Sequence, residues 1–130
     1  MNLLRNNFST VDKIPPVEAD PVKIRWVVSN LVHNAILYAM GKGAVDLRLE
    51  KKNDEIIFSC LDGGIGILRE DYPKIFTKFY RSKEAMEISP EGAGLGLYIS
   101  KAVIERSGGK MWFESEKGKG SGFFFSLPVS

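Results

Sequence analysis

Three glycines alternate with small or aliphatic residues in the run Gly92-Ala-Gly-Leu-Gly-Leu97, directly before a stretch of helical character from Tyr98 to Ser107. Glycine allows the backbone to take positive φ angles and to approach a ligand closely. The free N–H groups at the start of a helix, together with the helix dipole, attract anions. The run is therefore typical of a backbone that holds phosphate, although flexible glycine loops without a ligand are also common.

A second glycine-rich run begins with a carboxylate, in Asp62-Gly-Gly-Ile-Gly-Ile67. Asp62 follows a strongly apolar segment, which predicts that its carboxylate lies at the end of a buried strand. A carboxylate there can accept a hydrogen bond from an amino group of a ligand, and Gly64 and Gly66 would leave room for that ligand. The alternative is an ordinary Asp-Gly turn without a ligand.

Asn30 and Asn34 lie four residues apart in a segment whose apolar residues recur with helical spacing. In a helix, side chains at this separation share one stripe, here beside the apolar stripe. An Asn carbonyl is a neutral, hard oxygen ligand, which suits a Mg²⁺ ion that keeps several waters and takes further oxygens from phosphates. Without the other motifs, the two residues would be interpreted as ordinary solvated positions.

The two asparagines require a long helix, and the sequence predicts one from Asp20 to about Met40. Asp20 is a good N-cap, and Pro21 suits the first helical position, where no N–H partner is needed. Apolar residues at steps of three and four indicate one buried face, formed by Ile24, Val27, Val28, Leu31, Ala35 and Tyr38.

The other predicted elements are mostly strands joined as hairpins. Asn53-Asp54 tolerates the left-handed conformations of a tight turn, so the strands on either side are expected to be antiparallel neighbours. Together the elements predict an α/β (α+β) fold, a two-layer sandwich with helices packed on one face of a mostly antiparallel mixed sheet. In chain order they are an extended stretch at 7–13, strands at 45–50 and 55–61, a short helical stretch at 70–80, a helix at 95–107, and strands at 110–115 and 122–127 around a glycine-rich turn at 118–122.

The composition limits the classes of function. With 130 residues, 44% of them hydrophobic, the chain can bury one ordinary core, and a single domain over residues 1–130 is expected. The net charge of +2, from 18 basic and 16 acidic residues, is too balanced to predict a nucleic-acid partner. One cysteine excludes an internal disulfide framework, and the sequence has no secretory signal and no long apolar run. A reducing, cytoplasmic setting is expected, while a membrane anchor outside these residues stays open.

Four motifs follow one another in the chain: Asn30-x-x-x-Asn34, Asp62-x-Gly-x-Gly-Ile67, Ile75-Phe-Thr-Lys-Phe-Tyr-Arg81 and Gly92-x-Gly-Leu-Gly-Leu97. In this order they resemble the catalytic, ATP-binding domain of bacterial sensor histidine kinases, which belong to a superfamily with DNA gyrase, the MutL mismatch-repair proteins and a heat-shock chaperone. The resemblance covers about residues 18–128. It implies the histidine kinase ATPase-like (Bergerat) fold, with ATP lying between the Asn helix, the Asp loop and a mobile lid.

The resemblance also implies roles for particular residues. Asn34 would hold Mg²⁺ and be catalytic together with Arg81, whose guanidinium would reach the γ-phosphate. Asp62 would accept a hydrogen bond from the exocyclic amine of adenine and so select ATP over GTP. The ATP-contacting residues implied in this way are Asn30, Asn34, Tyr38, Asp62, Gly64, Gly66, Ile67, Lys78, Tyr80, Arg81, Gly92, Gly94, Leu95, Gly96 and Leu97.

Structural interpretations without a role in binding stay open for two positions, Tyr38 and Arg81. Tyr38 could cover the adenine ring or pack in the core, since it lies on the apolar stripe. Arg81 could be a solvated surface residue. Phe76 and Phe79, three residues apart on one predicted helical face, are expected to anchor the lid, which would span residues 81–91.

His33 is the only histidine of the chain, and it is followed by Asn34. In the family that the sequence resembles, the phosphoacceptor is a histidine followed by an acidic residue on a separate two-helix dimerisation domain. The chain is therefore expected to lack the phosphoacceptor and to act on one in trans. Its expected partners are the histidine-bearing dimerisation domain of the parent kinase and a cognate response regulator, and the isolated domain is expected to be a monomer.

Two further positions separate the possible functions. The ATP-hydrolysing relatives carry Glu as a general base where this chain has Asn30, which favours transfer to a histidine over hydrolysis. Leu37 stands where the kinases usually have a Lys that touches phosphate. This departure keeps an alternative open, namely a nucleotide-binding switch or docking module with little or no turnover.

Overall fold

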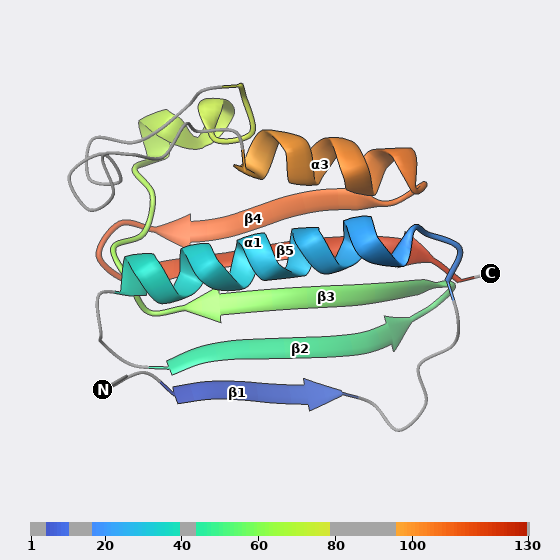
Figure 1. The fold of residues 1–130 in the computed structure, drawn as a ribbon. Coiled ribbons are helices and arrows are strands. Elements are labelled where there is room, and N and C mark those ends of the chain that lie inside the picture. The colour runs from blue at the N-terminus through green and yellow to red at the C-terminus, as the bar shows by residue number, and fades with distance from the viewer. Residues whose placement is uncertain (1–4, 11–16, 40–43, 79–95, 130) are drawn as a thin grey trace.

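The computed structural model describes residues 5–10, 17–39, 44–78 and 96–129, and within these ranges it forms two layers. A five-stranded sheet makes one layer, and both long helices lie on the same face of it (Figure 1). The elements are β1 (Arg5–Thr10), α1 (Pro21–Ala39), β2 (Ala44–Lys52), β3 (Glu55–Asp62), the 3₁₀ helix η1 (Arg69–Lys74), α3 (Gly96–Arg106), β4 (Lys110–Glu116) and β5 (Gly120–Pro128).

The sheet has the strand order β1-β2-β3-β5-β4. β1 is parallel to β2, and every other neighbouring pair is antiparallel, so the predicted mixed but mostly antiparallel sheet is confirmed. The predicted tight turn between β2 and β3 is also confirmed, because Asn53 has a φ of 57°. Asn tolerates this left-handed conformation better than most residues, since its short polar side chain can hydrogen-bond locally.

The helix α1 begins where its capping residues predict. The Asp20 carboxylate accepts a hydrogen bond from the backbone N–H of Val22 at 2.9 Å, which satisfies one of the free donors of the first turn. Val27, Leu31 and Ala35 are buried on the face that covers the sheet. The helix therefore packs against the sheet through the apolar stripe that its periodicity indicates.

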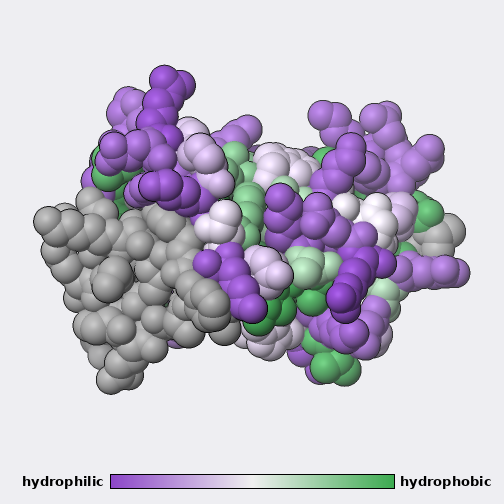
Figure 2. All heavy atoms as spheres, turned by 90° about the horizontal axis from the view of Figure 1, so that it is seen from above, coloured by the Kyte–Doolittle hydropathy of each residue, from purple (hydrophilic) through white to green (hydrophobic). Residues whose placement is uncertain are grey.

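One core lies between the helices and the sheet. Its centre joins α1 to Ile104 of α3 and to Phe58 and Phe125 of β3 and β5, whose rings stack with centroids 5.1 Å apart. α1 contacts β2, β3 and β5, while α3 contacts β4, β5 and α1. The face seen from above in Figure 2 is mostly hydrophilic, with scattered apolar side chains, and the exposed Tyr98 and Ile99 belong to α3.

Several predicted boundaries differ from the structure, and β1, for example, begins at Arg5 and not at the predicted residue 7. Over its described residues, 70–78, the helical stretch predicted at residues 70–80 forms only the short 3₁₀ helix η1, which contains Pro73 and gives way to a turn after Lys74. Proline lacks an N–H and cannot extend a regular helix. Phe76 was predicted to lie on a helical face, and it lies in a turn instead. The last hairpin also has a shorter turn than predicted, because β5 already begins at Gly120.

Candidate functional site

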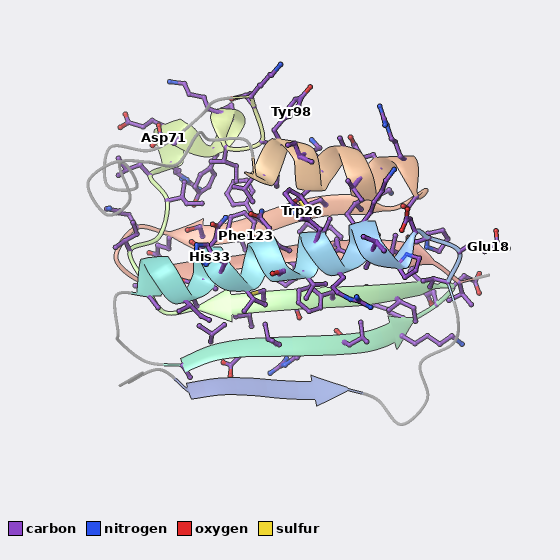
Figure 3. All side chains as sticks on the ribbon, viewed as in Figure 1. Glu18, Trp26, His33, Asp71, Tyr98 and Phe123 are labelled. Carbon is purple, nitrogen blue, oxygen red and sulfur yellow. The ribbon has the colours of Figure 1, made fainter. Side chains whose placement is uncertain are left out.

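The predicted motifs that the structure describes come together at one end of the sandwich. The C-terminal half of α1, the end of β3 and the start of α3 all lie at the same end in Figure 1. Figure 3 shows His33 on this half of α1, at the end of the molecule where Asp71 of η1 also lies. Antiparallel strands and the short β3–η1 connection bring these chain segments together, although they are far apart in the sequence.

Asp62 is half-buried at the last position of β3. Its Oδ1 accepts a hydrogen bond from the backbone N–H of Gly64 at 2.9 Å, and the backbone N–H of Ser121 donates to the same carboxylate. Burial raises the pKa of Asp62 above its usual value, and the two backbone hydrogen bonds oppose this rise. The Asp-Gly turn therefore exists, and it also fixes a carboxylate at the strand end, as the apolar segment before it predicts.

The structure shows why position 66 requires a glycine, which the sequence did not reveal. Its φ is +71°, and a Cβ atom there would overlap the backbone carbonyl oxygen of Glu116. The loop after β3 packs backbone to backbone against the β4–β5 hairpin, and only glycine allows this approach. Ile67, the last residue of the motif, is half-buried, and its backbone N–H donates to Ser115 Oγ at 2.8 Å.

The two asparagines of α1 have different surroundings. Asn30 Nδ2 donates to Ser100 Oγ at 3.2 Å, and a Cβ on Gly96 would lie 2.7 Å from Asn30 Oδ1. The sequence predicted that Asn30 presents its amide on an open face of the helix. In the structure, the amide packs against the first turns of α3. Asn34, one turn later, is half-buried and belongs to the C-terminal half of α1.

Phe76 packs against the sheet and α3, while the lid that it was expected to anchor, residues 81–91, lies outside the described residues. Its ring contacts Phe113 and Phe123 edge-on, with centroids 5.8 and 6.4 Å away, and Lys101 Nζ lies 5.0 Å from its centroid. These contacts join the segment after η1 to α3 and to the sheet. Lys78, two residues later, is exposed.

Several predicted site residues lie outside the described residues and remain predictions: Phe79, Tyr80, Arg81, Gly92, Gly94 and Leu95. The same holds for the side chains of Leu37 and Tyr38. Of the final glycine motif, the structure describes Gly96 and Leu97, which form the start of α3 within the helix predicted at 95–107. Leu97 is half-buried and packs against the core.

Sequence reasoning missed Ser100 and Ser115, which hold Asn30 and the loop after β3 respectively. Serine is common on strands and helices, so neither residue type nor spacing singles them out. It also missed that Cys60, two residues before Asp62, is buried and donates to the carbonyl of Leu31 at 3.7 Å. Burial, followed by the negative charge of Asp62, raises the pKa of this thiol to about 12.

Within the part of the chain that the structure describes, no group of three or more His, Cys, Asp or Glu residues could hold a metal ion. Asn34 can supply a single amide oxygen. One such ligand fits an ion whose other ligands are waters and the oxygens of a bound phosphate. No helix among the described residues is long and apolar enough to cross a membrane.

Known proteins resemble this chain in sequence and in fold. The chain is 38% identical over 114 residues to the sensor histidine kinase WalK of Bacillus subtilis, covering 86% of the chain and 19% of that protein. It is 36% identical over 120 residues to the phytochrome-like protein Cph1 of Synechocystis, covering 92% of the chain and 16% of the relative. The chain thus spans less than a fifth of the length of these curated relatives.

Solved structures show the same fold. The catalytic domain of histidine kinase ThkA matches with a TM-score of 0.82 and 32% identity, over 97% of this chain and 79% of that one. Full-length ShkA, determined in complex with AMPPNP, matches with a TM-score of 0.82 and 26% identity, over 98% of this chain and 26% of that one. Residues 19–130 also match the family described as histidine kinase-, DNA gyrase B-, and HSP90-like ATPase, and the chain belongs to this family.

Proposed function

We propose that this domain binds Mg-ATP and transfers the γ-phosphoryl group to a histidine on a separate dimerisation domain, as the catalytic domain of a two-component sensor histidine kinase. The observation that carries the proposal is the Asp62 carboxylate, held by two backbone N–H groups at the end of β3, at the same end of the sandwich as the C-terminal half of α1 and the start of α3. The family match and the resemblance to a kinase determined with AMPPNP support it.

Each motif has a separate task in this proposal. Asp62 accepts a hydrogen bond from the exocyclic amine of adenine, whereas the carbonyl oxygen of guanine would face the carboxylate unfavourably. Asn34 offers its amide oxygen to Mg²⁺, which would neutralise charge on the phosphates. The α3 N-terminus and the glycines before it receive the phosphates, and Arg81 reaches the γ-phosphate.

The transfer itself needs little chemistry from the protein. The bond between the γ-phosphorus and its bridging oxygen breaks, a phosphorus–nitrogen bond to the acceptor imidazole forms, the imidazole gives up one proton, and ADP leaves. A neutral imidazole nitrogen is already nucleophilic, so a general base at the position of Asn30 is not needed. Catalysis then depends on positioning and on stabilising charge.

The acceptor belongs to another domain in this proposal. His33 is exposed on α1, and the residue after it is Asn34, not an acidic residue. The partners are then the histidine-bearing dimerisation domain of a parent kinase and its cognate response regulator, in the cytoplasm. The isolated domain is proposed to be monomeric, because dimerisation would belong to the acceptor domain.

A reconstitution tests the phosphotransfer directly. The domain is mixed with a cognate histidine-bearing dimerisation fragment, Mg²⁺ and ATP labelled at the γ-position. We expect acid-labile, base-stable label on the fragment, and loss of that label when the acceptor histidine is replaced by Gln or when Asn34→Ala is used. An unlabelled fragment, with ATP binding to the domain intact, would contradict the kinase proposal.

Leu37 favours a second candidate, a nucleotide-binding switch with little turnover, because a cation is missing at its position. Leu37→Lys should add a positive charge near phosphate and tighten ATP binding or raise the transfer rate by about tenfold, which corresponds to ~1.4 kcal/mol. Titration with ATP and the labelling assay measure the two effects separately. If neither value changes, the site already has its charge from other residues.

A further inference from the structure

The loop after β3 (residues 62–67, the Asp62 loop) is joined at several points to the end of the β4–β5 hairpin (residues 115–121, the hairpin end). The backbone N–H of Ile67 donates to Ser115 Oγ at 2.8 Å. The backbone N–H of Gly118 donates to the carbonyl of Ile65 at 2.8 Å. The backbone N–H of Ser121 donates to the Asp62 carboxylate. The loop that carries the carboxylate therefore depends on the hairpin end for its position.

Ser115 Oγ lies at the centre of these hydrogen bonds. It accepts from Ile67, donates to the carbonyl of Gly120 at 2.9 Å and lies 2.9 Å from Ser121 Oγ. A hydroxyl has one proton and two acceptor sites. Because the proton of Ser115 goes to Gly120, the hydroxyl of Ser121 must be the donor in the third contact. The hydroxyl of Ser115 therefore uses all of its hydrogen-bonding capacity to join the two segments.

Close backbone contacts leave these segments little freedom to shift. A Cβ on Gly66 would overlap the carbonyl oxygen of Glu116, and a Cβ on Gly120 would overlap that of Asp62. The main chain of Ser115 is held as well, because the hydroxyl of Tyr72 donates to its carbonyl oxygen and the Tyr72 ring packs edge-on against Phe113. Ser115 thus connects η1, the hairpin end and the Asp62 loop.

We propose that Ser115 is a positioning residue that sets how well Asp62 recognises the amino group of an adenine nucleotide. This inference rests on the proposed function. A hydrogen bond weakens steeply when its distance or angle departs from the optimum, so a carboxylate on a loosened loop loses discrimination before it loses its charge. Without the Ser115 hydroxyl, the N–H of Ile67 and the hydroxyl of Ser121 each lose a hydrogen-bond partner. The loop can then shift so that these groups hydrogen-bond to water.

The test measures selectivity, because a role in folding alone would not alter it. Equilibrium dissociation constants in Mg²⁺ are measured for ATP and for purine riboside triphosphate, which lacks the exocyclic amine. We expect Ser115→Ala to reduce the preference for ATP about tenfold, mainly by weakening ATP binding. Ser115→Thr, which keeps the hydroxyl, should retain most of the preference. In the Asp62→Asn background, Ser115→Ala should no longer change the ratio.

Two further variants keep the result interpretable. Ser107→Ala removes a half-buried hydroxyl that donates to the Val103 carbonyl at 3.0 Å, at the other end of α3, and should leave the ratio unchanged. Tyr72→Phe keeps the ring but removes the donor to the Ser115 carbonyl, and should reduce the preference about threefold. It decides the question if Ser115→Ala does not fold.

The outcomes separate this inference from the function on which it rests. Equal weakening of both nucleotides in Ser115→Ala, or an unchanged ratio in folded Ser115→Ala or Tyr72→Phe, would overturn the positioning role while leaving ATP binding intact. Failure of the unmodified domain to bind ATP at all would overturn the proposed function itself.

Discussion

At the scale of single residues, Asp62 combines a charge with a half-buried position. Burial disfavours its ionised form, and the hydrogen bonds from Gly64 and Ser121 only partly offset this effect, so its pKa is raised. The folded state then holds the proton of Asp62 more tightly than the unfolded chain does. The contribution of this residue to stability is therefore fully present below the usual Asp pKa and is lost as the pH rises through the raised value.

We predict that Asp62→Asn removes this part of the pH dependence. The free energy of unfolding of the unmodified protein, minus that of the variant, should be largest in acid and should decrease toward neutral pH. Urea unfolding curves at a series of pH values from about 3 to 7 measure the difference. Parallel stability profiles for the two proteins would show that Asp62 titrates normally in the folded state.

At the scale of elements, the crossing of α1 and α3 depends on the absence of a side chain at Gly96. The amide of Asn30 occupies the space where a Cβ on Gly96 would lie, 2.7 Å from Oδ1 and 2.8 Å from Nδ2. The same amide donates to Ser100, which is 0% exposed. A glycine of the run for which we propose phosphate binding thus also serves the packing of two helices.

The effect of Gly96→Ala on the free energy of unfolding should therefore depend on the residue at position 30. Gly96→Ala should destabilise the protein by ~1 kcal/mol and weaken nucleotide binding, because it displaces the Asn30 amide. In the Asn30→Ala background the same substitution should become neutral or stabilising, since Ala favours a helix over Gly by up to ~1 kcal/mol. Unfolding free energies of the four proteins give the coupling. Additive effects would argue against the contact.

At the scale of the whole molecule, the site and the core share their elements. Ile104 of α3 is 0% exposed and belongs to the cluster that also contains Leu31 of α1 and Phe125 of β5. The helices that carry Asn34 and Gly96 are held on the sheet by this one cluster. Loss of packing there should therefore act on stability first and on binding only through the folded fraction.

Ile104→Ala tests this dependence. It should lower the free energy of unfolding by ~2–5 kcal/mol, the range for removing a large buried aliphatic side chain. Ile99→Ala, on the same helix but 37% exposed, is the matched control and should cost much less. Urea unfolding and ATP titration below the transition are the measurements. An intact fold with strongly weakened binding in Ile104→Ala would mean that the core residue acts on the site directly.

Most of the fold could be predicted because local signals decide it. The cap and apolar stripe of α1 and the Asn53 turn each reflect short-range rules, and the structure bears them out. The helix at η1 was predicted too long. The residue composition there favours a helix, but Pro73 limits its length and the ring of Phe76 packs against Phe113. That second effect comes from Phe113, 37 residues further along the chain, and has no local signature.

The sequence by itself determined which residues are candidates for the proposed chemistry. Residue type, spacing and order identify Asp62, Asn34 and the glycines because a carboxylate, an amide and a bare backbone have distinct chemical capacities wherever they are placed. The tertiary structure alone decided how these groups are held: Asn30 turned toward Ser100, Gly66 pressed against Glu116, and Ser115 joined to Ile67. These contacts connect residues that are distant in the chain, and such pairs become neighbours only when the helices and strands pack around one core.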